Sequence, residues 1–224
     1  MTVSRRGRRH VRAWGAAVGV ATLGLMLAAQ GPATAIARVV NPGEKIDPIS
    51  DPLTGVSLAE RPELIGQVIV DLLVPFSSTD PDSGAVFQGT VRTQVVREDV
   101  SGTLDFYYTV DPHLDEVRIS GFGHFLTDID WREDLGKGAS GGFRSADGDL
   151  LDLAFNGGGP TFVKTDATAF ARTGVFVAIP DSGEPPAAAA VFAPIPLPPA
   201  ALAAPAAFAV AAYAGRRINA RRAE

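Results

Sequence analysis

The stretch Leu104-Asp105-Phe106-Tyr107-Tyr108-Thr109-Val110 has an apolar or aromatic side chain at every second position. Successive side chains of a β-strand point to opposite faces of a sheet, so this period predicts a strand with Leu104, Phe106 and Tyr108 on one face. The same period recurs in four other stretches, residues 91–95, 125–131, 151–155 and 173–179. Turn-forming residues separate these stretches, and short alternating strands spaced in this way are typical of antiparallel sandwiches and barrels.

We therefore predict an all-β fold: an antiparallel, jelly-roll-like β-sandwich with its core in residues 85–180. Residues 38–84 are interrupted by prolines and predict an extended segment with one strand, the apolar run 64–74, packed on the domain. Residues 181–194 join Asp, Ser, Gly and Pro to a run of alanines and predict a linker. The chain of 224 residues has no Cys, so the core must hold the domain together without disulfides.

The first 37 residues have the three parts of a secretory signal peptide. Five arginines lie before residue 13, an uncharged apolar run follows over 13–29, and small residues then precede two cleavage points, after Ala35 and after Ala37. We expect this signal helix to direct the chain through the Sec translocon and to be removed by signal peptidase. An uncleaved N-terminal anchor is the alternative.

The last thirty residues, 195–224, also have an ordered set of parts. The proline-rich segment Ile195-Pro196-Leu197-Pro198 is stiff and non-helical, and it precedes the uncharged run 200–215. As a helix this run would be about 24 Å long, against ~30 Å of hydrocarbon, so it predicts a marginal transmembrane helix. A cluster of basic residues should keep the C-terminus in the cytoplasm: Arg216, Arg217, Arg221 and Arg222. The alternative is a disordered Ala/Pro-rich tail.

This order of proline motif, apolar span and terminal arginines resembles the PEP-CTERM sorting signal of Gram-negative bacteria, and its VPLPA-type variant most closely. Ile195 stands where the variant usually has Val, and Pro199 is an extra residue before Ala200. The resemblance implies that an intramembrane exosortase recognises Ile195, Pro196, Leu197 and Pro198. It would then remove the tail and release or re-anchor the protein outside the cell.

The charge of the domain limits its partners. Nine of the 20 basic residues lie in the two terminal segments, so residues 38–190 keep 11 basic and 24 of the 25 acidic residues, a net charge of −13. Such a surface repels nucleic acid and anionic lipid, and it tolerates divalent cations and neutral polysaccharide. We expect no nucleic-acid partner.

Histidine offers little chemistry in the mature chain. Only His113 and His124 remain there, and a Ser-His-Asp triad drawn from either would lack the Gly-x-Ser-x-Gly elbow. Two histidines without Cys also make a zinc site a poor expectation. We predict no catalytic residue, no metal site and no cofactor.

Carboxylates are the stronger lead. Asp128 and Asp130 precede a glycine-rich loop, and Asp147 and Asp149 flank Gly148. Oxygen-rich glycine loops suit calcium, but Asp147-Gly148 reads more simply as a tight hairpin turn. The same carboxylates could also form the acid–base pair of a glycosidase. Aromatic side chains such as Tyr107 could stack on sugars if they lie on the solvent face.

Together these features predict a non-enzymatic protein of the cell envelope or extracellular matrix, associated with exopolysaccharide or biofilm. The tail would first insert into the inner membrane, and the protein would then reach the cell surface or the medium. The alternative is a secreted carbohydrate-binding or polysaccharide-hydrolysing β-sandwich protein.

Overall fold

A computed structural model describes residues 38–111, 114–155, 158–180 and 184–197. This part of the chain is all-β, as predicted: it consists of strands in two antiparallel sheets, with two 3-10 helices of three residues each, η1 (Pro62–Leu64) and η2 (Glu133–Leu135). The predicted signal helix and transmembrane helix lie outside the described residues. Within the described residues, no helix is long and apolar enough to cross a membrane.

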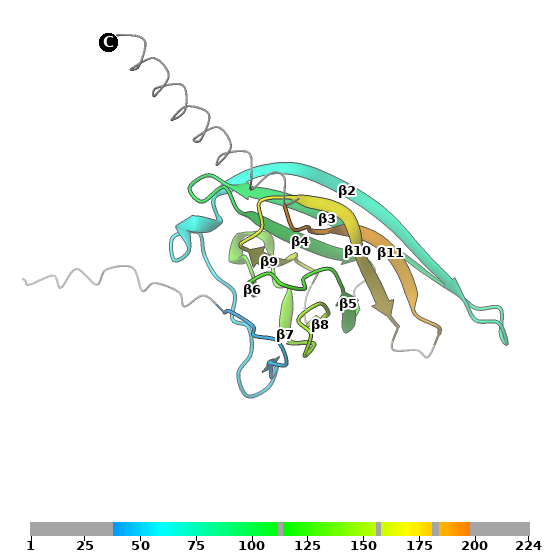
Figure 1. The fold of residues 1–224 in the computed structure, drawn as a ribbon. Helices are drawn as coiled ribbons and strands as arrows, with labels where there is room; N and C mark the ends of the chain where they lie inside the picture. The colour runs from blue at the N-terminus through cyan, green and yellow to red at the C-terminus, as the bar shows by residue number, and fades with distance from the viewer. Residues whose placement is uncertain (1–37, 112–113, 156–157, 181–183, 198–224) are drawn as a thin grey trace, which may run out of the picture. The chain divides into compact units, whose positions relative to one another are not determined.

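The first sheet has five strands in the order β2-β3-β4-β9-β6 (Figure 1). Its strands are β2 (Gly66–Thr79), β3 (Val86–Glu98), β4 (Leu104–Asp111), β9 (Thr161–Thr165) and β6 (Thr127–Trp131). The strands β2, β3 and β4 follow one another directly as a meander. β2 and β3 pair along their whole length, and the β4 pairing stops where Asp111 meets Thr90, so the β2–β3 hairpin continues past the end of β4.

The second sheet has six strands in the order β1-β7-β8-β5-β10-β11. Its strands are β1 (Lys45–Ile46), β7 (Ala139–Arg144), β8 (Leu151–Phe155), β5 (Glu116–Ile119), β10 (Phe170–Ile179) and β11 (Ala187–Pro194). The edge strand β11 lies against β2 of the first sheet (Figure 1), and the hydroxyl of Ser78 on β2 donates to the carbonyl of Pro185 at 2.5 Å.

The core lies between the facing sides of the two sheets. The alternating residues of β4 are buried as predicted: Leu104, Phe106 and Tyr108 are fully inaccessible to solvent and pack in one cluster with residues of the second sheet. Phe76 of β2 meets Phe176 of β10 with 5.7 Å between ring centroids. These contacts make the fold a β-sandwich, because each sheet buries one face against the other.

The other face of the five-stranded sheet is also covered. Residues 56–64, here called the cover segment, pack on it through Val56 and Leu64. Their partners on the sheet are Val96, Tyr107 and Phe162, which form a second, smaller apolar cluster. Tyr107 is therefore buried, at 2% exposure, which excludes the alternative that it stacks on sugars from the solvent face.

Three predicted details of the fold need correction. The strand order is not that of a jelly roll, because β2, β3 and β4 are neighbours in one sheet, whereas successive strands of a jelly roll mostly alternate between its two sheets. The predicted strand 64–74 is β2, which runs from 66 to 79 at an edge of its sheet and buries only Val74 and Phe76. The domain also begins before residue 85, because β1 and β2 belong to its two sheets.

The predicted linker needs a fourth and larger correction. Residues 187–194 of the expected linker 181–194 form β11, which pairs with β10. Alanine and valine are apolar, and the small side chains let this strand approach the core closely: Ala187, Val191 and Ala193 are buried to 1% exposure or less. The composition that suggested a flexible spacer is that of a buried edge strand.

Candidate functional site

The predicted sorting motif begins immediately after the last strand. The amide of Ile195 donates to the carbonyl of Ala169 at 3.1 Å, so this residue is still attached to the sandwich. Pro196 and Leu197 are exposed and belong to no helix or strand. The other predicted targeting residues lie outside the described residues: Ala35, Ala37, Pro198, Arg216, Arg217, Arg221 and Arg222.

A groove of about 630 Å³ lies beside the start of this motif. Ser120, His124 and Asp149 line it, together with Pro194, Ile195 and Pro196. His124 has φ of 70°, the left-handed region that non-glycine residues rarely adopt. The groove thus brings together one serine, one histidine and one aspartate, the residue types of a hydrolytic triad.

The three side chains do not form that triad. The Oδ1 atom of Asp149 accepts the amides of Gly121 and Gly123, both at 3.2 Å, and the hydroxyl of Ser120 accepts the amide of Val175 at 3.3 Å. Within the part of the chain that the structure describes, His124 has no hydrogen bond to either of them. His113, the other candidate, lies outside the described residues.

The residues considered for calcium are separated by the fold. Asp147-Gly148 forms the predicted tight turn between β7 and β8: Gly148 has φ of 77°, and its amide donates to the carbonyl of Ser145 at 2.8 Å. Asp128 and Asp130 instead lie on β6, buried at the covered face of the other sheet. In the described ranges, no group of three or more His, Asp and Glu side chains could hold a metal ion.

A buried charge cluster around Asp128 is the most unusual polar feature of the domain. Asp128 on β6 and Asp105 on β4 both pair in register with Lys164 on β9, which lies between them. Arg61 reaches down from the cover segment, and its Nη2 atom donates to Asp128 at 2.5 Å. Asp105, Asp128 and Arg61 are each 1% exposed or less.

The cluster extends beyond these residues. Arg61 also donates from Nε to Glu63 at 2.8 Å, and its guanidinium carbon lies 5.6 Å from the centre of the Phe162 ring. The ammonium of Lys164 is paired with the buried carboxylate of Glu98. Several polar atoms are buried without a hydrogen-bond partner among the described residues: both carboxyl oxygens of Asp105, Oδ1 of Asp128 and Nη1 of Arg61.

Burial dominates the acid–base chemistry of this cluster. The pKa of Asp105 is raised to about 8, mainly by desolvation and also by the nearby carboxylates of Asp128 and Glu63, against the opposing charge of Arg61. Desolvation also raises the pKa of Asp130. Asp105 is therefore mainly protonated at neutral pH.

The sequence alone predicts only part of this cluster, namely which face of β4 carries Asp105. The period-two pattern assigns Asp105 and Tyr107 to the face opposite Leu104 and Phe106, but that face would normally be solvated in an antiparallel sandwich. Arg61 lies in a proline-rich loop whose docking on the sheet depends on contacts distant in sequence. Both facts explain why sequence analysis missed the cluster.

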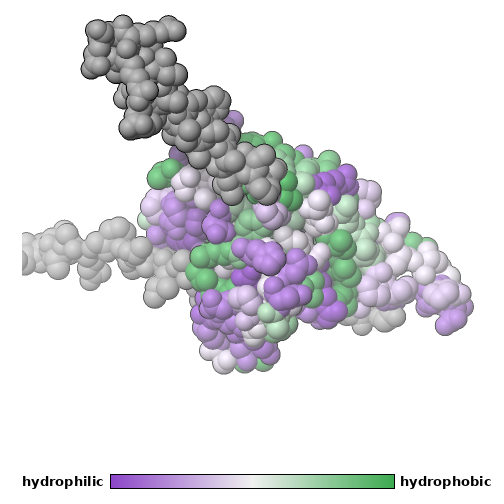
Figure 2. Space-filling view, in the orientation of Figure 1, coloured by the Kyte–Doolittle hydropathy of each residue, from purple (hydrophilic) through white to green (hydrophobic). Residues whose placement is uncertain are grey.

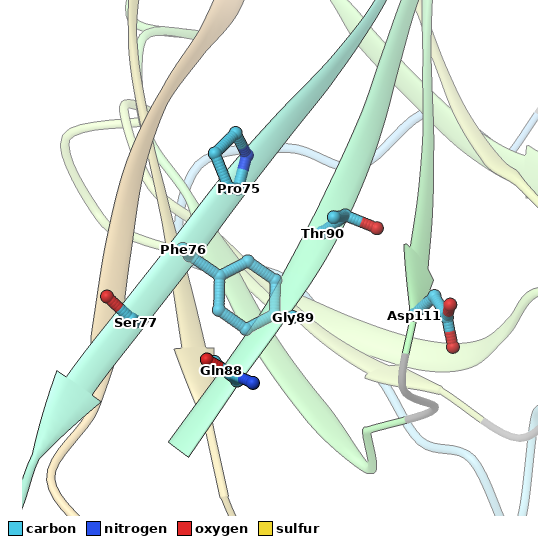
Figure 3. A pocket seen from close by; sticks show the side chains of 7 residues that line it. All are labelled: Pro75, Phe76, Ser77, Gln88, Gly89, Thr90 and Asp111. Carbon is cyan, nitrogen blue, oxygen red and sulfur yellow. The ribbon is translucent and has the colours of Figure 1, made fainter. Parts of the chain in front are cut away.

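A second groove, of about 490 Å³, lies where the β2–β3 hairpin passes the end of β4 (Figure 3). Pro75, Thr90 and Asp111 are direct partners across the three strands, and Ser77 is opposite Gln88. The hydroxyl of Thr90 points toward β4, the strand that carries Asp111 (Figure 3). Phe76 and Gly89 complete the lining.

The polar side chains of this groove have no protein partners. Within the described part of the chain, no hydrogen bond or ion pair engages the side chains of Ser77, Gln88, Thr90 or Asp111. The loop that closes the hairpin beyond the groove is hydrophilic (Figure 2) and carries Asp80 and Asp82. The groove therefore presents donors and acceptors that solvent or a ligand can use.

Comparison of the chain with protein-family models, with curated proteins and with solved structures finds no match.

Proposed function

We propose that the protein is an exported, non-enzymatic β-sandwich protein of the Gram-negative cell envelope or extracellular matrix, delivered there by a C-terminal sorting signal of the PEP-CTERM type. The observation that carries the proposal is the junction at Ile195. The strand β11 ends at Pro194, the amide of Ile195 still bonds to the sandwich, and the motif continues with Pro196 and Leu197 exposed.

The proposed route follows the order of the chain. An N-terminal signal helix enters the Sec translocon, and signal peptidase cuts after Ala35 or Ala37. The sandwich then folds outside the cytoplasm, where the absence of Cys removes any need for disulfide formation. Residues 200–215 remain in the inner membrane as a transmembrane helix, since translocating the four terminal arginines costs more than leaving alanines inserted.

Recognition of the motif by an exosortase-like enzyme is the last step. Proline cannot donate a backbone hydrogen bond and disfavours a helical residue before it, so a segment with Pro196 and Pro198 stays extended and open to an enzyme. Leu197 offers a side chain that is 41% exposed for recognition. After the tail is removed, the protein would reach the cell surface or the medium and associate there with exopolysaccharide or biofilm.

The test compares processing of motif variants in cells that carry the sorting enzyme. The double variant Pro196→Ala/Pro198→Ala should still insert in the membrane but should be trimmed at least about tenfold more slowly, because a helix can then extend through the cleavage region. The mass of the C-terminal fragment over time gives the rate. Pro186→Ala is the matched control, because Pro186 is exposed and precedes β11.

Two outcomes would count against the proposal. Trimming of the double variant at the wild-type rate would mean that the motif is not recognised and that the tail is only an anchor. Equal slowing in Pro186→Ala would mean that the effect comes from the domain and not from the motif.

Carbohydrate binding is a second candidate function for the domain itself, and the unpartnered polar groove at the end of β4 favours it. Hydrolysis has less support. Glu116 and Asp152 are carboxylates at a third groove, but both accept hydrogen bonds from Arg118, at 2.8 and 2.9 Å. Both carboxylates are therefore already engaged by one guanidinium, whereas the two carboxyl groups of a glycosidase must be available to the scissile bond and a water.

A further inference from the structure

We propose that the groove at the end of β4 is a binding site for a neutral saccharide chain. The side chains that contact the ligand are those of Ser77, Gln88, Thr90 and Asp111. This inference rests on the carbohydrate-binding candidate and not on the sorting signal. It assigns the ligand class and the residues, neither of which follows from export.

The chemistry of the side chains matches a polyhydroxylated ligand. Hydroxyl groups donate and accept at once, the amide of Gln88 offers both functions, and Asp111 accepts. None of these side chains is engaged by the described protein, so binding does not require an existing contact to break. Beside them, the exposed ring of Pro75 offers apolar atoms for the C–H face of a sugar ring.

The register of the strands spaces these groups in two rows. Thr90 and Asp111 are cross-strand partners, as are Ser77 and Gln88, and the rows are two residues apart on β3. Directly opposed side chains have their Cβ atoms about 5 Å apart, and residues i and i+2 of a strand are about 7 Å apart. The four groups can therefore contact neighbouring sugar units of one chain.

Charge selects a neutral ligand. Residues 38–190 carry a net charge of −13, and two of the carboxylates that make up this charge, Asp80 and Asp82, lie in the adjacent hairpin loop. An anionic polysaccharide or a nucleic acid would be repelled by this field. Among the described residues that line the groove, Asp111 alone is charged, which is too little to select a cationic ligand.

An extended peptide is the competing ligand. Past Thr90, the residues of β3 pair with β2 but not with β4, so a peptide strand could add to this open edge through backbone hydrogen bonds. Such binding would use the backbone of residues 86–89 and would depend little on side chains. The saccharide inference uses the side chains, and this difference separates the two.

The experiment uses mature protein purified from cells that express the full chain. Isothermal titration calorimetry measures binding of cellohexaose, laminarihexaose and maltohexaose, with hexagalacturonate as the anionic comparison and an alternating Thr-Val hexapeptide as the strand comparison. We expect at least one neutral hexasaccharide to bind and the other two probes not to. Gln88→Ala and Thr90→Val should each weaken that binding about three- to tenfold, the cost of one or two hydrogen bonds.

Gln67→Ala is the matched control. Gln67 is an exposed glutamine at the opposite end of the same hairpin, paired with Arg97, and its loss should leave affinity unchanged. Melting temperatures of all variants within 2–3 °C of wild type, roughly what surface changes cause, would show that they fold.

The remaining outcomes overturn the inference at different levels. If no neutral saccharide binds at millimolar concentration, the carbohydrate-binding function itself is wrong. If one binds and the groove variants bind it as well as wild type does, the function stands and the site is wrong. If the peptide alone binds, the groove is a strand-addition site.

Discussion

Arg61 is the residue on which the cover segment depends most. Its guanidinium is 1% exposed, and Asp128, its main partner, is equally buried. Removing the positive charge leaves a carboxylate in a water-excluded site without its counter-ion, which is the most destabilising way to break a buried pair. The cover segment would also lose the contact of Arg61 with the ring of Phe162.

We therefore expect Arg61→Ala to lower the free energy of unfolding by about 3–5 kcal/mol in urea denaturation. Arg118→Ala is the control: Arg118 also binds two carboxylates, but its side chain is 46% exposed, so the expected loss is below about 1 kcal/mol. Equal losses in the two variants would show that the burial of Arg61 adds nothing to its pair.

Asp105 makes the stability of the domain depend on pH. Its pKa is raised by burial from 3.8 to about 8, so the folded protein holds a proton that the unfolded chain releases. The resulting stabilisation is complete below about pH 4, declines as pH rises, and is lost near pH 8. The slope is at most about 1.4 kcal/mol per pH unit.

Asp105→Asn should flatten this dependence, because the amide stays neutral at every pH. The variant should gain stability relative to wild type as pH rises from 5 to 8, measured by urea denaturation at each pH. Asp71→Asn is the opposite control: its hydrogen bond to Arg92 lowers the pKa of Asp71, so its loss costs stability at neutral pH and not at low pH. A wild-type profile that is level between pH 5 and 8 would contradict the assignment.

At the scale of elements, β11 shows where sequence patterns fail. The four consecutive alanines at its start show no period, since alanine suits a spacer, a helix or a buried strand equally well. The strand is stabilised by contacts with residues distant in sequence. Tyr108 donates its hydroxyl to the carbonyl of Phe192 at 2.6 Å, and β10 pairs with β11 through backbone hydrogen bonds. The strand β4, in contrast, could be predicted from its own residues, because its alternation separates a buried face from its opposite.

The membership of β11 in the sheet is testable by substitution. Val191→Asp should destabilise the domain by at least about 3 kcal/mol, because Val191 is fully buried and the new charge would have no partner. Ala188→Asp on the exposed side of the same strand should change stability by less than about 1 kcal/mol, and thermal melting of both variants measures the difference. If both are neutral, residues 187–194 act as the spacer that their composition suggests.

At the scale of the whole molecule, what could be predicted was what the sequence encodes locally. The all-β class and the two faces of β4 follow from the period-two alternation of apolar residues. The Asp147-Gly148 turn follows from the two residue types that form it. The buried cluster of Arg61, Asp105 and Asp128 does not, because it joins a loop and two strands far apart in the chain. The groove at the end of β4 likewise exists because β3 continues past the last residue of β4 that pairs with it. No local sequence pattern predicts where one strand ends relative to its neighbour.

The direct passage from β11 to the proline motif has a mechanical consequence for the anchored form. Only Pro196–Pro199 separate Ile195 from the apolar run that begins at Ala200. This linker spans at most about 18 Å between Ile195 and Ala200 when fully extended. An inserted tail would hold the sandwich within about 2 nm of the lipid surface, where its net charge of −13 would be repelled by any anionic head groups of the outer leaflet. This repulsion would pull the linker outward. Cleavage of the linker would then release the domain from the membrane.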